Sequence, residues 1–335
     1  MQLLAKFRID SFMLGILATV ALAALLPARG TAADILEWAT KIAIGVLFLL
    51  YGARLEPREA LAGLKHWRLH ASVLAATFVL FPLLGLALRL LVPSVLTPDL
   101  YTGVLFLCLV PSTVQSSIAF TALARGNVAG AVVSASLSNL IGVFATPLLV
   151  MACMSTTAGV HISPSAILSI VIQLLLPFLA GQLLRPHLGW ILSHPAATKT
   201  VDRGSVYLVV YSAFSAGVTE GIWHGLSART LISTTLVCAA LLALVLTLTS
   251  LGSRLLGFSR ADRIVLTFCG SKKSLATGLP MASVLFVGHP IGLIVLPLML
   301  FHQIQLFTCA ALAQRYARRS DPAPAESPSP AAELV

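Results

Sequence analysis

Apolar segments of about 20 residues recur along almost the whole chain, and this feature restricts the fold more than any other. Of the 335 residues, 58% are hydrophobic and 10% are charged, whereas soluble domains average about 25% charged residues. The polar connections between the segments are too short to form domains. The sequence therefore predicts an all-α integral membrane protein with ten spans, at residues 11–28, 35–53, 71–91, 100–124, 128–152, 165–184, 205–222, 230–252, 263–287 and 290–314.

The basic residues are distributed unequally between alternate connections. With ten spans and a cytoplasmic N-terminus, 16 of the 22 Lys and Arg residues lie on the cytoplasmic side and four on the outer side, while Lys272 and Lys273 lie within a span. The positive-inside rule accounts for this bias. We expect a multi-pass protein of the inner (plasma) membrane with both termini in the cytoplasm. The net charge of +10 then requires no nucleic acid, and membrane lipid is the expected surrounding, with no obligate protein partner.

The N-terminal 33 residues also resemble a signal peptide, because Lys6 and Arg8 precede an apolar run. We favour a retained first span, since its removal would leave nine spans. The five cysteines lie within spans or at their ends without paired spacing, so neither a disulfide nor a zinc site is expected. Residues 317–335 are rich in proline and predict a disordered cytoplasmic tail.

An uncharged outer connection near residues 153–164 divides the chain into two halves with five spans each. An odd number of spans places the second half in the opposite orientation, which is the arrangement of many secondary transporters. We therefore expect two inverted five-helix repeats, at residues 1–157 and 158–316.

Polar residues interrupt the fourth span at Pro111–Ser117 and the ninth at Gly270–Ser274. Proline removes a backbone donor, and the carbonyl and N–H groups that such a break frees cannot face lipid. Interruptions at corresponding positions of two repeats indicate a binding site at the bilayer midplane. We expect discontinuous helices four and nine that cross there. Four further prolines are expected only to kink packed helices: Pro82, Pro147, Pro177 and Pro297.

Neutral polar groups surround the predicted crossing and suit a small polar solute or a partly dehydrated ion. They are Ser112, Thr113, Gln115, Ser116, Ser117, Ser134, Ser136, Ser138, Asn139, Gly270, Ser271, Ser274, His302, Gln303 and Gln305. The alternative for the fifth span is close helix packing through small residues, and His302 could equally be a satisfied buried histidine.

Lys272 and Lys273 are the most unusual residues of this region, because all 12 acidic residues lie at span ends, in connections or in the tail. A charge at bilayer depth costs roughly 2.5–3.5 kcal/mol and marks a functional site. The ammonium group could replace a bound cation, attract an anion or carry a proton. Consecutive helical residues point about 100° apart, so we expect one lysine to face a cavity. The alternative is that the side chains reach the interface.

At these residues the chain resembles the bile acid:sodium symporter family, and in particular the subgroup that includes the human family member seven and its bacterial relatives. The matching stretches are residues 110–117, 123–128 and 268–275, and the resemblance covers roughly residues 10–316. It implies a panel of spans 1, 2, 6 and 7 and a core of spans 3–5 and 8–10. It also implies transport of an organic anion, coupled in the bile acid members to two sodium ions.

The resemblance further implies where sodium ligands would lie. Ser116 and Ser117 match a Ser-Asn pair that supplies sodium ligands, and the second position departs from the pattern. Thr77 and Lys272 stand where the family has glutamines, and Phe268 stands where it has a shared acidic ligand. These departures argue against sodium sites of the standard form. A sodium ion near Ser116 and Ser117 remains an alternative.

The sequence thus predicts a secondary active transporter that moves a small organic anion by alternating access, in which a lysine replaces a cation. No cofactor is expected beyond Na⁺ or H⁺ as a coupling ion. The alternatives are a sodium-dependent organic anion symporter of the standard family type and a membrane regulator that transports nothing. An enzyme is not expected, because no base–nucleophile spacing is recognisable and the sequence Gly-Ser-Lys-Lys-Ser lacks the spaced glycine of a phosphate-binding loop.

Overall fold

The computed structural model describes residues 11–54, 66–157, 171–219, 221 and 227–318, and within them every regular element is a helix. The first half contains α1 (Ser11–Leu25), α2 (Thr31–Arg54), α4 (Trp67–Ala75), η3 (Ala76–Leu80), α5 (Phe81–Ala87), η4 (Leu88–Leu91), α6 (Pro98–Leu109), α7 (Gln115–Leu123) and α8 (Val128–Thr157). The second contains η5 (Val171–Leu175), α10 (Leu176–Leu184), α11 (Gly189–Leu192), α12 (Pro195–Thr219), α13 (Ala228–Leu255), α14 (Arg260–Ser271), α15 (Leu275–Leu285) and α16 (Ile291–Arg318).

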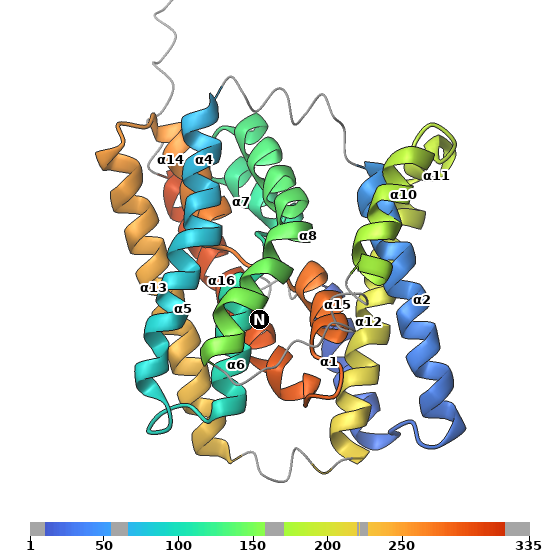
Figure 1. The fold of residues 1–335 in the computed structure, drawn as a ribbon. Coiled ribbons are helices and arrows are strands. Elements are labelled where there is room, and N and C mark those ends of the chain that lie inside the picture. The colour runs from blue at the N-terminus through green and yellow to red at the C-terminus, as the bar shows by residue number, and fades with distance from the viewer. Residues whose placement is uncertain (1–10, 55–65, 158–170, 220, 222–226, 319–335) are drawn as a thin grey trace, which may run out of the picture.

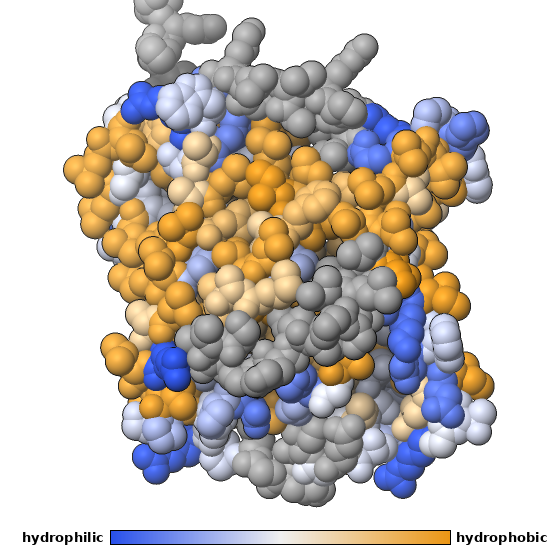
Figure 2. All heavy atoms as spheres, in the orientation of Figure 1, coloured by the Kyte–Doolittle hydropathy of each residue, from blue (hydrophilic) through white to orange (hydrophobic). Residues whose placement is uncertain are grey.

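Long apolar helices make this a multi-pass membrane protein. Four helices of the described residues are long and apolar enough to cross a bilayer: Trp67–Leu91, Val128–Met154, Ala228–Leu255 and Ile291–Arg318. Three shorter helices are also apolar: Leu14–Leu25, Pro98–Leu109 and Ile172–Leu184. On the face that Figure 2 shows, apolar residues form a belt across the middle, with hydrophilic residues gathered towards the two ends.

The helices form two groups that lie side by side (Figure 1). Helices α1, α2, α10 and α12 pack together in the smaller group. The larger group contains α4 to α8 and α13 to α16, and α12 contacts α15 and α16 where the groups meet. The predicted boundary between the repeats, next to residue 158, and most of the predicted tail lie outside the described residues.

Both polar breaks are present, and each is shorter than the sequence suggested. Helix α6 ends at Leu109 and α7 begins at Gln115, while α14 ends at Ser271 and α15 begins at Leu275. Val110 and Lys272 adopt extended conformations directly after the helix ends. The new start of α15 is stabilised by Ser274, whose hydroxyl accepts a hydrogen bond from the Thr277 N–H (3.2 Å).

A π-helical turn, η3, interrupts the third apolar segment and frees one carbonyl group. The Phe81 N–H bonds to the Ala76 oxygen, five residues earlier. In the same register, an N–H at position 82 would bond to the Thr77 oxygen, but Pro82 has no N–H. The Thr77 carbonyl is therefore left for a partner from another segment. Pro82 does more than kink a helix, which is the only role that the sequence suggested.

Helices α2 and α10 touch through their backbones at two glycines. A Cβ atom on Gly52 would collide with the Phe178 carbonyl, and one on Gly181 would collide with the Leu49 carbonyl. The Gln182 side chain adds a hydrogen bond to the Gly52 oxygen (2.6 Å). Close approach through small residues is the usual way in which helices associate in a membrane, where lipid and apolar side chains are equally apolar.

Candidate functional site

The two helix breaks meet, and hydrogen bonds join them directly. The Ser274 N–H donates to the Pro111 carbonyl (2.8 Å), and the Ser112 hydroxyl donates to the Cys269 carbonyl at the end of α14 (2.6 Å). From α8, the Ser138 hydroxyl accepts from the Ser112 N–H (3.0 Å), and the Asn139 amide donates to the Ser112 carbonyl (3.1 Å). Backbone groups freed by the breaks are thereby paired within the protein, as the bilayer requires.

Lys273 lies at this crossing with its ammonium group fully enclosed. The side chain has no exposed surface, and Nζ donates to the carbonyls of Thr77 (2.9 Å), Cys108 (2.9 Å) and Val110 (2.8 Å). An ammonium group has three N–H donors, so all of them are used. The Phe81 ring closes another side, with its centroid 4.1 Å from Nζ. One positive charge therefore lies among carbonyls at the C-terminal end of α6, where the helix dipole is negative.

Gln305 on α16 fixes the backbone of Lys273. Its side-chain oxygen accepts from the Lys273 N–H (2.9 Å), and its Nε2 donates to the Lys273 carbonyl (2.9 Å). The same Nε2 lies 2.8 Å from His302 Nδ1. Gln305 is fully buried and outside the cavity lining, so it acts as a clamp on the ninth-span break.

Lys272 is equally buried but has a different environment. Its Nζ lies 3.8 Å from the centroid of the Phe120 ring on α7 and has no hydrogen-bond partner among the described residues. The expectation that one lysine faces the cavity is therefore wrong, and neither side chain reaches the interface. The reason is that Lys272 is extended, and not helical as assumed. Successive side chains of extended backbone point to opposite sides, here towards α7 and towards η3 with α6.

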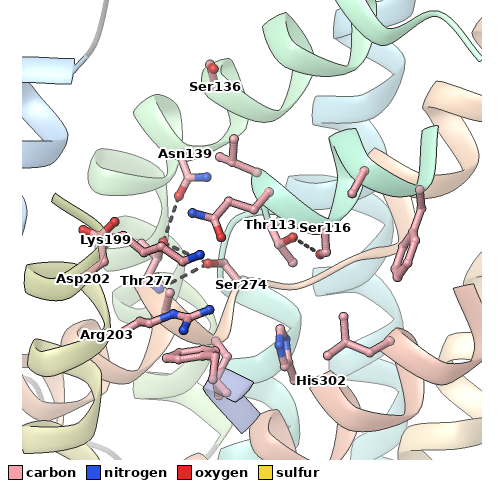
Figure 3. A pocket seen from close by; sticks show the side chains of 18 of the residues that line it. Thr113, Ser116, Ser136, Asn139, Lys199, Asp202, Arg203, Ser274, Thr277 and His302 are labelled. Carbon is pink, nitrogen blue, oxygen red and sulfur yellow. Dashed lines mark hydrogen bonds between the residues drawn. The ribbon is translucent and has the colours of Figure 1, made fainter. Parts of the chain in front are cut away.

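A cavity of about 1190 Å³ lies where the two helix groups meet (Figure 3). The crossing supplies one polar wall, and apolar side chains such as Phe178 and Phe307 supply others. The first residues of both short helices, Gln115 of α7 and Leu275 of α15, line it. The first turn of a helix carries N–H groups without intrahelical partners and a partial positive charge. Both helix ends therefore favour a negatively charged solute in this cavity.

Charged residues of the smaller group line the opposite wall. Arg54, Lys199 and Arg203 contribute three basic side chains, and Asp202 contributes one acidic side chain. Arg54 and Asp202 form an ion pair (2.8 Å), which leaves this wall with a net positive charge. Sequence reasoning missed the three basic residues as cavity groups because it assigned them to the positive-inside bias, and it counted Asp202 only among the acids outside the membrane centre. The only indication in the sequence is that these residues lie at the cytoplasmic ends of the predicted spans 35–53 and 205–222.

The structure divides the predicted site residues into two sets. One set lines the cavity: Thr113, Gln115, Ser116, Ser136, Asn139, Ser274, His302 and Gln303. The other does not line it: Thr77, Ser112, Ser117, Ser134, Ser138, Gly270, Ser271, Lys272, Lys273 and Gln305. Several of the second set pair with backbone or with other side chains, as Ser271 does with the Thr267 carbonyl (2.6 Å) and Ser134 with the His70 ring (2.8 Å).

The side chains of Ser116 and Ser117 do not converge on one point. The Ser116 hydroxyl lines the cavity and lies 2.5 Å from that of Thr113, whereas Ser117 is fully buried. Among the described residues, no three His, Cys, Asp or Glu side chains are grouped in a way that could hold a metal ion. Oxygen ligands for a sodium ion at this place would have to come from hydroxyls and carbonyls.

Comparison with known proteins agrees with a transporter. The family model described as the SBF-like CPA transporter family matches residues 10–318. An uncharacterised protein of Pseudomonas aeruginosa is 54% identical over 97% of this chain and 98% of its own. The Escherichia coli protein named "Putative symporter YfeH" is 47% identical over 97% of this chain and 98% of its own.

More distant relatives carry transporter names as well. The rat protein named "Sodium/bile acid cotransporter 7" is 26% identical over 93% of this chain and 94% of its own. The names of these relatives describe symporters and cotransporters, and not enzymes. Because the family model covers nearly the whole length of the described helices, the chain belongs to the SBF-like CPA transporter family, which is similar to the bile acid:sodium symporters.

Proposed function

We propose that the protein is a secondary transporter that moves a small organic anion across the inner membrane by alternating access. The observation that carries this proposal is the cavity, in which the N-terminal ends of α7 and α15 face a wall with three basic side chains. Half-helix ends of this kind hold anionic groups in other transporters with broken helices. Aromatic and aliphatic side chains on the remaining walls suit an apolar body attached to the anionic group.

We further propose that Lys273 replaces a coupling cation. Three carbonyl oxygens surround its Nζ at 2.8–2.9 Å, which is the type of oxygen environment that a bound cation would need. Phe268 and Lys272 stand where the related sodium-coupled pattern has an acidic residue and a glutamine. A tethered ammonium supplies a positive charge without a bound ion, so transport would require no sodium at this position. If transport is coupled to an ion, the candidates are Na⁺ near Ser116 and Ser117, and H⁺.

The proposal includes the membrane arrangement. Ten spans in two inverted halves, residues 1–157 and 158–316, would place both termini in the cytoplasm, with residues 317–335 as a cytoplasmic tail. Lys199 and Arg203, which line the cavity, belong to a connection that the positive-inside rule assigns to the cytoplasm. The cavity therefore opens to the inside in this state, and an outward-open state completes the cycle.

Uptake into proteoliposomes tests transport and coupling together. Radiolabelled taurocholate and a panel of aromatic sulfonates and carboxylates serve as probes, the bile acid being chosen from the name of the rat relative. Imposed sodium, proton or no gradients are compared. We expect saturable uptake of at least one anion without sodium. Strict sodium dependence that survives Lys273→Gln would overturn the cation replacement and support a standard sodium-dependent symporter.

A different outcome distinguishes a regulator. If no anion of the panel were taken up, while one of them raised the melting temperature of the purified protein, the cavity would be a sensing site and the transport proposal would fail. Neutral analogues of the same size serve as controls, because a cavity built for anions should discriminate against them.

A further inference from the structure

The Phe120 ring contacts both the cavity and the ammonium group of Lys272. Phe120 lies on α7 and lines the cavity together with Ser116, Ala119 and Leu123. The ring also covers Lys272 Nζ, 3.8 Å from its centroid. Lys272 itself does not line the cavity and has no exposed surface. Displacement of this side chain would therefore bring Lys272 Nζ into contact with a solute in the cavity.

Lys272 Nζ has no partner of opposite charge among the described residues. Nζ has no hydrogen-bond partner there, and the two ion pairs found among the described residues do not include it. The titratable groups that act on it are the thiols of Cys269 on α14 and Cys309 on α16, and α7 presents no carboxylate to it. The face of an aromatic ring attracts a cation, but a ring supplies no hydrogen-bond acceptor of the strength of a carbonyl or carboxylate.

The neighbouring lysine shows that the fold can satisfy a buried ammonium. Lys273 is just as buried and bonds to three carbonyls, whereas Lys272 bonds to none. An uncompensated buried charge is costly, so a chain that keeps one gains most when a partner of opposite charge arrives. The two adjacent lysines therefore differ: every N–H donor of the Lys273 ammonium has an acceptor, whereas the Lys272 ammonium has none.

We propose that Lys272 is the counter-ion of the transported anion, and that the Phe120 ring is a gate whose displacement exposes Lys272. This inference rests on the proposed transport of an organic anion and names the group that holds its negative end. The ligand is a carboxylate or sulfonate that enters through the cavity and displaces the Phe120 ring. The ion pair forms only when the Phe120 ring is displaced, so anion binding favours the conformation with the displaced ring.

Chemical labelling tests whether Phe120 controls access to Lys272, and it requires no knowledge of the natural solute. Pyridoxal 5′-phosphate, an anionic aldehyde that forms a borohydride-reducible bond with amines, is applied to the whole purified protein, and modified lysines are located by mass spectrometry. We expect Phe120→Ala to label Lys272 faster than the wild type and Phe120→Trp to label it more slowly. Lys273 is the internal control and should stay unlabelled. Absence of Lys272 labelling in Phe120→Ala would overturn the proposal.

Binding of naphthalene-2-sulfonate, measured by thermal stabilisation, tests whether Lys272 is the counter-ion. The neutral 2-naphthalenemethanol is its control ligand, and Lys41→Met is the control variant, because Lys41 is half-exposed and outside the cavity lining. We expect Lys272→Met to weaken binding at least about tenfold and Lys41→Met to leave it unchanged. Equal binding by wild type and Lys272→Met would overturn this inference but leave anion transport standing. No binding or uptake of any anion by the wild type would overturn both.

Discussion

The Ser274 N–H and the Pro111 carbonyl form a 2.8 Å hydrogen bond that joins the break in the fourth apolar segment to the break in the ninth. Each break alone would expose backbone groups that lipid cannot satisfy. Together they satisfy one another, and a single crossing results. The crossing then places the first residues of α7 and α15 in the cavity lining, and it places carbonyl groups at the end of α6 next to the Lys273 ammonium.

Replacement of Lys273 should destabilise the fold. In Lys273→Met the carbonyls of Thr77, Cys108 and Val110 lose their shared donor, and each unsatisfied buried group costs about 1–3 kcal/mol. We expect a clearly lower melting temperature in detergent, measured by differential scanning fluorimetry, and no rescue by Lys273→Arg, since a guanidinium is larger and planar. Lys41→Met at a half-exposed position is the control, and a melting temperature equal to that control would contradict the role assigned to Lys273.

Replacement of Lys272, in contrast, should leave the stability of the fold unchanged or increase it. Met matches the length of the lysine stem and removes a buried charge that has no hydrogen-bond partner among the described residues. Exchange of buried charges for apolar groups of similar volume is often neutral or stabilising by about 1–4 kcal/mol. The Lys272→Met variant should therefore melt at the wild-type temperature or above it in the same assay. A decrease as large as that of Lys273→Met would show that Lys272 also has a structural partner.

A methyl group between α2 and α10 should not be tolerated. Gly52→Ala places a Cβ against the Phe178 carbonyl, which is backbone and cannot move aside, and overpacking typically costs about 1–3 kcal/mol. Gly252→Ala is the matched control, because this helical glycine has no atom within 4 Å of a new Cβ, and alanine there should stabilise by about 0.5–1 kcal/mol. Thermal melts of the two variants should move in opposite directions.

The charged wall of the cavity should tune anion affinity. Asp202→Asn removes the acidic side chain of the lining, and Arg203→Gln removes one of the three basic ones. At an effective dielectric constant near 20, a charge about 10 Å away contributes about 1.7 kcal/mol before screening by salt. Naphthalene-2-sulfonate should therefore bind more tightly to Asp202→Asn and more weakly to Arg203→Gln, with both differences shrinking in high salt. Equal affinities at low salt would place the anion elsewhere.

Much of the architecture could be read from the sequence, because bilayer physics is simple at the level of whole segments. The length of apolar runs predicted helices, and Pro111 and Gly270–Ser274 marked the places where two of them break. The exact ends could not be read, because they depend on partners from distant segments. Ser274, for example, caps α15 and also pairs with Pro111.

The roles of single polar residues were harder to predict. The sequence offered the hydroxyls and amides of the crossing as one site. In the structure, Ser112, Ser138 and Gln305 hold the breaks together. Ser116 and Gln303 line the cavity, and Asn139 does both. Nothing in their spacing separates the two uses. The Thr77 carbonyl escaped notice because its availability depends on a π-helical turn combined with Pro82.

The contact of α2 with α10 through Gly52 and Gly181 has a mechanical consequence. Side chains at a helix interface can change rotamers and let the helices slide, but two backbones in direct contact have no such freedom. These two helices must therefore travel as one rigid unit in any conformational cycle. The sliding surface is then left to the seam where α12 meets α15 and α16, which is where the cavity lies.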